Sequence, residues 1–398
     1  MRANTQEADV GLALGNTEVY LARYVGRGNR PTMTHFASRD DSESSAAGAA
    51  DDSGAAPTVV VETLYLSISP SLRFSLNADS DATCSAGRVD VGDTMWSDGV
   101  GRVIESPGGL YQVGDLIANK PKLFKWPWRR TNRWTERELW GVTYRVAEGA
   151  LAAEAAEAAE AAKVAKAADG QAGGTSNSTL HSHPEAALGV LGLAAMTAYF
   201  GVSDVLAKLA EGEERSQTGG PAEQRDLGTL IVSGASGKVG SIAGQVGRLI
   251  GYTRVVGITS TKAKVRHLVD VLGFDAAVLR GGGKTTEELA AEIAAACGLG
   301  GDGEGEGKEA GTGERMGEWG QISYFDNVGG DVSEAVAAGC LAEGSAVAIC
   351  GTMSQMSQSV ADQCWTEEAR RRGAKLQVGL SMQYGARVYR LLSGNACS

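Results

Sequence analysis

The chain has 398 residues, which is enough for two or three domains of ordinary size. It carries 37 Lys and Arg against 48 Asp and Glu, so its formal net charge is −11, which disfavours nucleic acid or an anionic membrane as a partner. Its 55 glycines are roughly twice an ordinary share, but they follow no Gly-X-Y period, which excludes collagen.

The first residues, Met1–Gly15, lack a basic region followed by a long apolar one, so we expect no secretory signal peptide. No apolar run reaches the ~18 residues that a membrane span needs. The six cysteines include no Cys-x-x-Cys pair, and we expect reduced thiols in a cytoplasmic protein. We expect no metal site, because His181 and His183 lie in a polar stretch typical of a loop and zinc needs more ligands.

Four polar or low-complexity segments interrupt the chain and are expected to be disordered insertions, apart from an alanine-rich run with helical composition. They are Ser38–Pro57, Ala147–Ser182, Glu211–Asp226 and Gly298–Gly320. Together these segments carry a net charge of −14, so the rest of the chain is close to +3. The acidity of the protein therefore belongs to the insertions.

The first half predicts a mainly β domain. Three short runs, Val59–Ser67, Gly99–Glu105 and Val113–Ala118, have strand-like composition, with Gly and Pro between them. Trp126 and Trp128 could stack on a hydrophobic substrate, but aromatic residues in β domains are more often core.

A pair of arginines in this half allows two interpretations. Arg129 and Arg130 could attract a carboxylate, although a solvated pair is the simpler interpretation.

The second half predicts a parallel sheet covered by helices on both faces, because short apolar runs alternate with helical patterns. The runs are Thr229–Val232, Arg254–Ile258, Asp275–Leu279, Ile322–Asn327, Ser345–Cys350 and Lys375–Leu380. Thr285-x-x-Glu288 and Asp331-x-x-Glu334 predict helix starts. Six such strands is the count of a doubly wound dinucleotide-binding fold.

A glycine-rich turn follows the first of these runs. Gly234, Gly237 and Gly240 lie between a strand and a helix, with Ala235 where the strict GxGxxG pattern has its first glycine. In this context, backbone N–H groups and the helix N-terminus can bind a pyrophosphate. The alternative is a flexible turn without a ligand.

The end of the second run indicates the cofactor. An acid there would bind the ribose 2′-hydroxyl of NAD, but this chain has two cations and no acid. Lys264 and the Ser260 and Thr261 hydroxyls favour a 2′-phosphate, and Arg280 can add a further donor. The alternative is that Lys262 and Lys264 are only solvent-exposed side chains at a helix start and bind no ligand.

Five stretches resemble the zinc-free medium-chain dehydrogenase/reductases of the prostaglandin reductase type. They are Leu64–Arg73, Leu188–Gly201, the glycine turn, Val255–Ile258 with Leu272–Ala277, and Tyr324–Gly330. The Trp126-Pro-Trp128 element and Arg254-Val-Val-Gly resemble the 15-oxoprostaglandin 13-reductases in particular.

The resemblance implies an α/β protein with a GroES-like β-rich substrate domain, residues 8–185, and a Rossmann domain, residues 186–398, with a doubly wound parallel six-stranded sheet. It implies an enzyme that uses NADPH to reduce the carbon–carbon double bond of α,β-unsaturated ketones, such as 15-oxoprostaglandins or other lipid enones. A quinone or alkenal reductase of the same superfamily is the alternative enzyme. The partner is then a small molecule, and a homodimer through Lys375–Leu380 is also implied.

The resemblance also implies site residues. Those expected to contact NADPH are Gly234, Gly237, Lys238, Val239, Gly240, Lys264, Arg280, Asn327, Cys350, Gly351, Thr352 and Met356; those expected to contact substrate are Phe124 and Lys125. No catalytic residue is assigned. The Cys350 side chain ends an apolar strand and is expected to pack there without acting as a nucleophile.

Some residues depart from the family pattern. Met356 replaces a tyrosine that supports the enolate, and a thioether donates no hydrogen bond. Arg280 replaces another tyrosine, and Ser69-Pro-Ser-Leu-Arg73 replaces Asp-Pro-Tyr-Met-Arg. The chain reaches Ser398 without the family's C-terminal return. These departures motivate a second hypothesis, a catalytically weak NADPH-binding relative.

Overall fold

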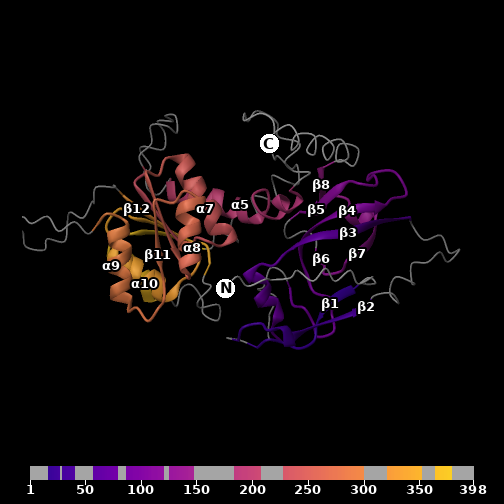
Figure 1. The fold of residues 1–398 in the computed structure, drawn as a ribbon, viewed down its shortest axis with the longest axis horizontal. Coiled ribbons are helices and arrows are strands. Elements are labelled where there is room, and N and C mark those ends of the chain that lie inside the picture. The colour runs from indigo at the N-terminus through magenta and orange to yellow at the C-terminus, as the bar shows by residue number, and fades with distance from the viewer. Residues whose placement is uncertain are drawn as a thin grey trace, which may run out of the picture. The chain divides into compact units, whose positions relative to one another are not determined.

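The computed structural model of the chain describes residues 17–26, 29–40, 57–78, 87–120, 125–147, 183–207, 227–299, 321–351 and 364–378. The chain divides into two compact units, Met1–Leu188 and Gly189–Ser398 (Figure 1). Each unit has its own hydrophobic clusters.

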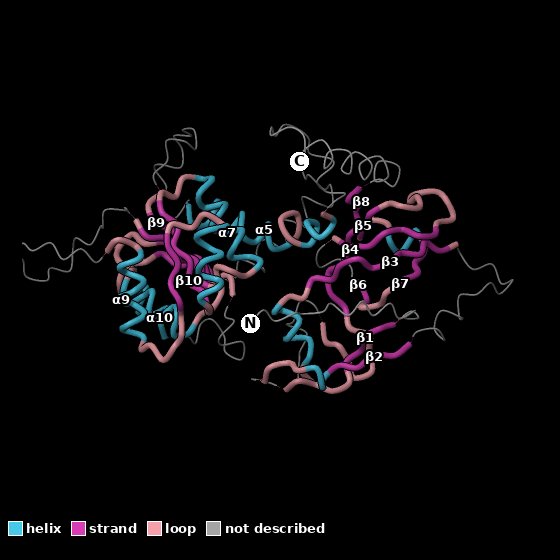
Figure 2. Tube along the Cα trace, in the orientation of Figure 1, coloured by secondary structure: helices cyan, strands magenta, loops and turns pink. Residues whose placement is uncertain are grey.

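The first unit is built mainly from antiparallel strands (Figure 2). Its strands are β1 (Thr17–Leu21), β2 (Phe36–Asp40), β3 (Thr58–Ser67), β4 (Trp96–Glu105), β5 (Leu116–Asn119), β6 (Trp126–Pro127), β7 (Thr131–Thr135) and β8 (Thr143–Ala147). Its short helices are η1 (Met33–His35), η2 (Pro70–Leu76), α2 (Glu136–Leu139) and η3 (Pro184–Leu188). The main sheet has the order β7-β3-β4-β5-β8, with β6 on β4, and β1 pairs with β2. The predicted β-rich domain is confirmed.

A tryptophan fills the centre of this sheet. Trp126 is fully buried, and its Nε1 donates a hydrogen bond to Oγ1 of Thr63 at 3.0 Å. Strand β4 carries glycines opposite the ring because a Cβ at Gly99 would lie 2.4 Å, and one at Gly101 2.8 Å, from its atoms. Trp126 is therefore a core residue. Trp128 is half-buried, and its Nε1 donates to Oγ of Ser97 at 2.9 Å.

A buried carboxylate ties β1 to its neighbours. Glu18 is 1% exposed and accepts hydrogen bonds from Nε of Arg129 at 2.6 Å, from Oγ1 of Thr94 at 2.9 Å and from Arg39. Burial alone would raise the pKa of Glu18, but the donors lower it below the usual 4.5. Because Arg129 is held by this internal carboxylate, it is not available to a substrate carboxylate, whereas Arg130 is exposed, in line with the simpler interpretation of the pair.

The second unit is a sheet with helices on both faces (Figure 1). Its strands are β9 (Thr229–Ser233), β10 (Arg254–Thr259), β11 (Ala276–Leu279), β12 (Ile322–Asp326), β13 (Ala346–Ile349) and β14 (Lys375–Val378). Its helices are α5 (Leu193–Tyr199), η4 (Phe200–Ala207), α7 (Lys238–Ile250), α8 (Lys262–Arg266), η6 (His267–Val271), α9 (Thr286–Ala296), α10 (Gly330–Gly339) and α11 (Cys364–Arg371).

All neighbouring strands of this sheet are parallel, and their order is β11-β10-β9-β12-β13-β14. This is the order of the doubly wound dinucleotide-binding fold, so the predicted six-stranded parallel sheet is confirmed. Leu230 and Val232 of β9 pack in the cluster that includes α7, whereas Ile231 packs in the cluster of α9 and α10. A strand buried on both faces must be apolar throughout, which is why its sequence predicted it.

One of the two predicted helix starts agrees with the structure, and the other differs. The capping box of α9 at Thr285 and Glu288 is present as predicted. Helix α10, however, begins at Gly330 and not after Asp331. In α7, Ile242, Val246 and Ile250 are partly buried against the sheet, whereas Leu249 is 79% exposed.

Candidate nucleotide-binding site

The turn between β9 and α7 presents a helix N-terminus at the carboxyl end of the sheet. Gly234 has φ of +58°, a left-handed conformation that favours glycine, and its carbonyl accepts from the N–H of Gly237 at 2.9 Å. Gly237 is the N-cap of α7 and supplies no side chain to cap it. Backbone N–H groups at such a helix start favour an anion, since they combine hydrogen-bond donors with the positive end of the helix dipole.

Glycine at two further positions lets the turn pack closely. A Cβ at Gly240 would lie 2.5 Å from the Gly234 carbonyl oxygen and 2.8 Å from the Cα of Ala235. A Cβ at Gly257 in β10 would lie 3.0 Å from the Ala235 Cβ. Ala235 itself is fully buried, and its N–H donates to the Ile258 carbonyl at 3.1 Å. The alanine in the strict pattern's first glycine position is thus accommodated as a small core residue.

The ends of β10 and β11 add hydroxyls and cations to the same edge. Ser236 of the turn and Thr259 of β10 share a hydrogen bond between their hydroxyls at 2.8 Å. The N–H of Arg280 donates to the Thr259 carbonyl at 2.8 Å, so the residue after β11 lies beside the end of β10. Thr261 caps α8 by accepting from the N–H of Lys264 at 3.3 Å. The side chains of Lys264 and Arg280 are exposed.

A buried aspartate organises the turn after β12. Asp326 is fully buried, and its Oδ1 accepts from Ser233 Oγ at 2.7 Å, from Tyr324 Oη at 2.8 Å, and from the N–H groups of Val328 at 2.9 Å and Gly329 at 3.0 Å. Burial, together with the charge of Asp326, raises the pKa of Tyr324 well above its usual value, so this phenol stays protonated and donates. The carboxylate is therefore used for structure.

Asn327 is fixed at the junction of β9 and β12, where the strand order reverses. Its Nδ2 donates to the Ser233 carbonyl at 2.8 Å, and its N–H donates to Ser233 Oγ at 2.8 Å. In open α/β sheets, ligands bind outside the carboxyl ends of the strands at this switch point. Asn327 and the glycine turn occupy that place together.

The turn after β13 reaches the same point. The N–H groups of Cys350 and Gly351 donate to the Asp326 carbonyl at 2.8 and 3.1 Å. A Cβ at Gly351 would lie 3.3 Å from the backbone carbonyl oxygen of Asn327. Desolvation, with the nearby Asp326 charge, raises the pKa of the Cys350 thiol to about 12. Such a thiol is protonated at neutral pH and is a poor nucleophile.

The structure therefore brings together most of the nucleotide-contacting residues that the resemblance implied. Those placed at the carboxyl edge of the sheet, in the turns and helix starts there, are Gly234, Gly237, Lys238, Val239, Gly240, Lys264, Arg280, Asn327, Cys350 and Gly351. Thr352 and Met356 lie outside the described residues, as does Phe124. Lys125 lies in the first unit, with its Nζ 4.4 Å from the centre of the Trp96 ring.

The sequence analysis did not identify the residues whose hydrogen bonds fix the turns of the site. Ser233, Ser236, Thr259 and Asp326 contact one another or the site residues, although none was assigned a role. Their positions carried a signal, because each ends a strand or lies within the glycine turn, where parallel strands place functional side chains.

Within the ranges that the structure describes, no three or more His, Cys, Asp or Glu side chains gather in a way that could hold a metal ion. In those same ranges, no helix combines the length and the apolar character that crossing a membrane requires.

Comparison with known proteins agrees with this architecture. Residues 43–131 match a family model described as the N-terminal domain of oxidoreductase. The crystal structure of CurA from Vibrio vulnificus, also solved in complex with NADPH, is similar with a TM-score of 0.59 and 22% identity, over 95% of this chain and 86% of that one. The likeness establishes the fold.

Two curated relatives match about three quarters of the chain. The NADPH-dependent curcumin reductase of Escherichia coli (strain K12) is 27% identical over 299 residues, which are 74% of this chain and 61% of the relative. Prostaglandin reductase 1 of Mus musculus is 27% identical over 301 residues, 76% of this chain and 64% of the relative. The match thus spans less than two thirds of either relative. The chain is thus similar in sequence to these two reductases and shares the fold of CurA.

Proposed function

We propose that the chain is an NADPH-dependent oxidoreductase that reduces the carbon–carbon double bond of α,β-unsaturated ketones, such as 15-oxoprostaglandins or related lipid enones. The observation that carries the proposal is the glycine turn at the switch point of the sheet, next to a second strand end that offers cations and hydroxyls in place of an acid.

The residues fit NADPH at its pyrophosphate, at its 2′-phosphate and at its nicotinamide. The turn packs closely on itself, since a Cβ at Gly240 would lie 2.5 Å from the Gly234 carbonyl oxygen, and this geometry would offer a pyrophosphate the N–H groups at the start of α7, those of Lys238 and Val239 included. The positive charges of Lys264 and Arg280 suit a 2′-phosphate.

On the opposite side of the switch point, the anchored turns after β12 and β13 would hold the nicotinamide. Asn327, Cys350 and Gly351 present a fixed backbone there, and Thr352 and Met356 follow in sequence. The bound cofactor supplies a hydride, and the protein's task is to orient it. No acid or thiol of this turn is required, in keeping with the structural use of Asp326 and the raised pKa of Cys350.

The enone substrate class is supported by the relatives. One is named a curcumin reductase and others prostaglandin reductases, and this chain resembles both over the same length. Phe124 and Lys125 are the proposed substrate contacts. The resemblance also supports a homodimer, in which β14, the outer strand of the sheet, would pair with its copy.

The test separates binding from turnover. NADPH binding is measured by the fluorescence of the reduced nicotinamide, and turnover by the loss of its absorbance with an acyclic enone, a quinone and a 2-alkenal in parallel. Turnover with the enone supports the proposal. NADPH binding without turnover of any enone contradicts it, and turnover of quinones alone identifies the alternative enzyme.

A catalytically weak NADPH-binding relative is favoured by one observation, Met356 in the place of a tyrosine. A phenol that stabilises a developing enolate contributes through a hydrogen bond that a thioether lacks. Met356→Tyr should raise kcat about 10-fold or more if the native site is impaired, at unchanged NADPH affinity. An unchanged kcat would show that the enone reductase works without this phenol.

A further inference from the structure

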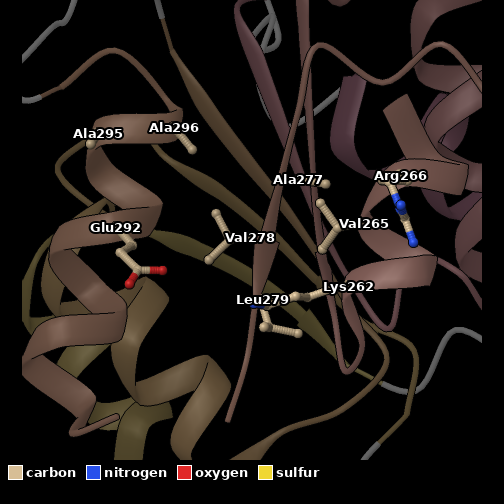
Figure 3. A pocket seen from close by; sticks show the side chains of 9 residues that line it. All are labelled: Lys262, Val265, Arg266, Ala277, Val278, Leu279, Glu292, Ala295 and Ala296. Carbon is tan, nitrogen blue, oxygen red and sulfur yellow. The ribbon is translucent and has the colours of Figure 1, made fainter. Parts of the chain in front are cut away.

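A groove lies at the β11 edge of the Rossmann sheet, and its lining includes no residue of the glycine turn. It lies between α8 and α9 over the edge strand β11 and has a volume of about 710 Å³ (Figure 3). Its floor is aliphatic, formed by side chains such as Val265, Val278, Leu279 and Ala295. Small-molecule sites commonly have volumes of about 300 to 1,000 Å³ and a mainly apolar lining.

The charge of the groove is positive. Lys262 and Arg266 of α8 line one side, and both side chains are exposed. Neither has a carboxylate partner among the residues that the structure describes. On the α9 side, the Glu292 carboxylate is paired with Lys284 at 2.5 Å, and the same ammonium donates to the Leu279 carbonyl at 2.9 Å. The Glu292 carboxylate is thus paired with a cation, whereas Lys262 and Arg266 have no carboxylate partner within the described ranges.

This pair of cations is separate from the proposed 2′-phosphate residue. On a helix of 3.6 residues per turn, Arg266 lies only about 40° around the axis from Lys262, whereas Lys264 lies about 200° away. Consistent with this, Lys264 does not line the groove. Helix α8 therefore presents basic side chains on two faces, and Lys262 and Arg266 line the groove from one of them (Figure 3).

We propose that this groove binds an amphiphilic anion, an alkyl chain that ends in a carboxylate or a phosphate. The chain lies on the aliphatic floor along β11, and the anionic head meets Lys262 and Arg266. A neutral apolar ligand would leave both cations without partners, and a hydrophilic anion would leave the floor exposed to water.

Dodecanoate is the probe, titrated by calorimetry into the chain saturated with NADPH. Affinity should rise along octanoate, decanoate and dodecanoate by up to about fourfold per added CH₂, because each methylene gains burial. Dodecanol should bind at least about 10-fold more weakly than dodecanoate, since it lacks the charge-assisted bonds. Dodecyl phosphate, compared with dodecanoate, shows which head the cations prefer.

Two variants locate the site. Lys262→Glu/Arg266→Glu should weaken dodecanoate binding at least about 10-fold, whereas Arg137→Glu/Arg370→Glu, an equal charge change at exposed residues elsewhere, should not. Ala295→Trp fills the groove while it keeps both cations, and should abolish binding without changing NADPH affinity. The proposal is overturned if dodecanoate does not bind, if dodecanol binds equally well, or if these groove variants leave the affinity unchanged.

Discussion

Gly240→Ala is the most direct structural test of the glycine turn. The added Cβ would lie 2.5 Å from the Gly234 carbonyl oxygen and 2.8 Å from the Ala235 Cα, and neither backbone atom can rotate away. Overpacking of this kind costs about 1 to 3 kcal/mol, and the better helix propensity of alanine returns up to about 1 kcal/mol. Subtracting about 1 kcal/mol for helix propensity leaves an expected net loss of unfolding free energy of up to about 2 kcal/mol.

The effect on the cofactor should be larger than the effect on stability. If the turn shifts to relieve the contact, at least one hydrogen bond to a charged phosphate is lost, which costs about 1.5 to 3 kcal/mol, or about 10- to 100-fold in NADPH affinity. Fluorescence titration gives the affinity, and denaturant unfolding gives the stability.

Two control variants should have smaller effects than Gly240→Ala. Gly237→Ala places a Cβ 3.1 Å from the Gly234 carbonyl oxygen, so its effect should be smaller than that of Gly240→Ala. Ser241→Ala, one residue further along α7, loses only a long hydrogen bond of 3.4 Å to the Lys238 carbonyl and should be nearly neutral. Wild-type NADPH affinity in the Gly240 variant would refute the reasoning, because it would mean that the turn does not need close packing to bind the cofactor.

Three further predictions follow. Lys264→Glu should lower NADPH affinity about 10- to 100-fold and leave NADH affinity unchanged in fluorescence titrations; equal losses for both cofactors would contradict a 2′-phosphate contact. Because the folded-state pKa of Glu18 lies below 4.5, its stabilising effect is present above that pH and is lost as the pH falls through the folded value; Glu18→Gln should therefore be less stable than wild type near neutrality, with a difference that shrinks in acid, and a pH-independent difference would argue against the ion pair with Arg129. Cys350, with a pKa of about 12, should react with iodoacetamide at least about 50-fold more slowly than a free thiol of pKa ~8.5, as measured by mass spectrometry of the native protein; rapid labelling would show that the thiol is not desolvated.

The Rossmann sheet was predictable because its rules are local. Each buried parallel strand must be apolar on both faces, so runs such as Thr229–Val232 and Arg254–Ile258 stand out from the helices between them. The glycine turn is likewise a local pattern, and Gly234 and Gly240 occupy the positions where φ or close packing requires glycine.

The β1–β2 pair was not predicted, and Ser38–Asp40 of β2 was assigned to an insertion. Strand β1 carries Glu18 at a buried position, which in a sequence resembles a polar surface residue. Its burial depends on Arg129, more than a hundred positions away, and no local pattern reveals that contact.

The start of α10 was missed for a similar reason. The sequence suggested a helix start around Asp331, but Asp326 already accepts hydrogen bonds from the N–H groups of Val328 and Gly329, so the chain turns into the helix earlier. The contact between Asp326 and Ser233 joins strands 93 positions apart. The residues that fix the geometry of the switch point can therefore be identified only from the assembled sheet.

The ratio of the NADPH and NADH dissociation constants, measured side by side on the purified chain, tests the central claim most directly. Lys264 and Arg280 at the edge of the second and third strands, with no acid at the end of β10, predict that NADPH binds at least about 10-fold more tightly than NADH, with the difference shrinking as salt is added. Equal affinities, or a preference for NADH, would contradict the account.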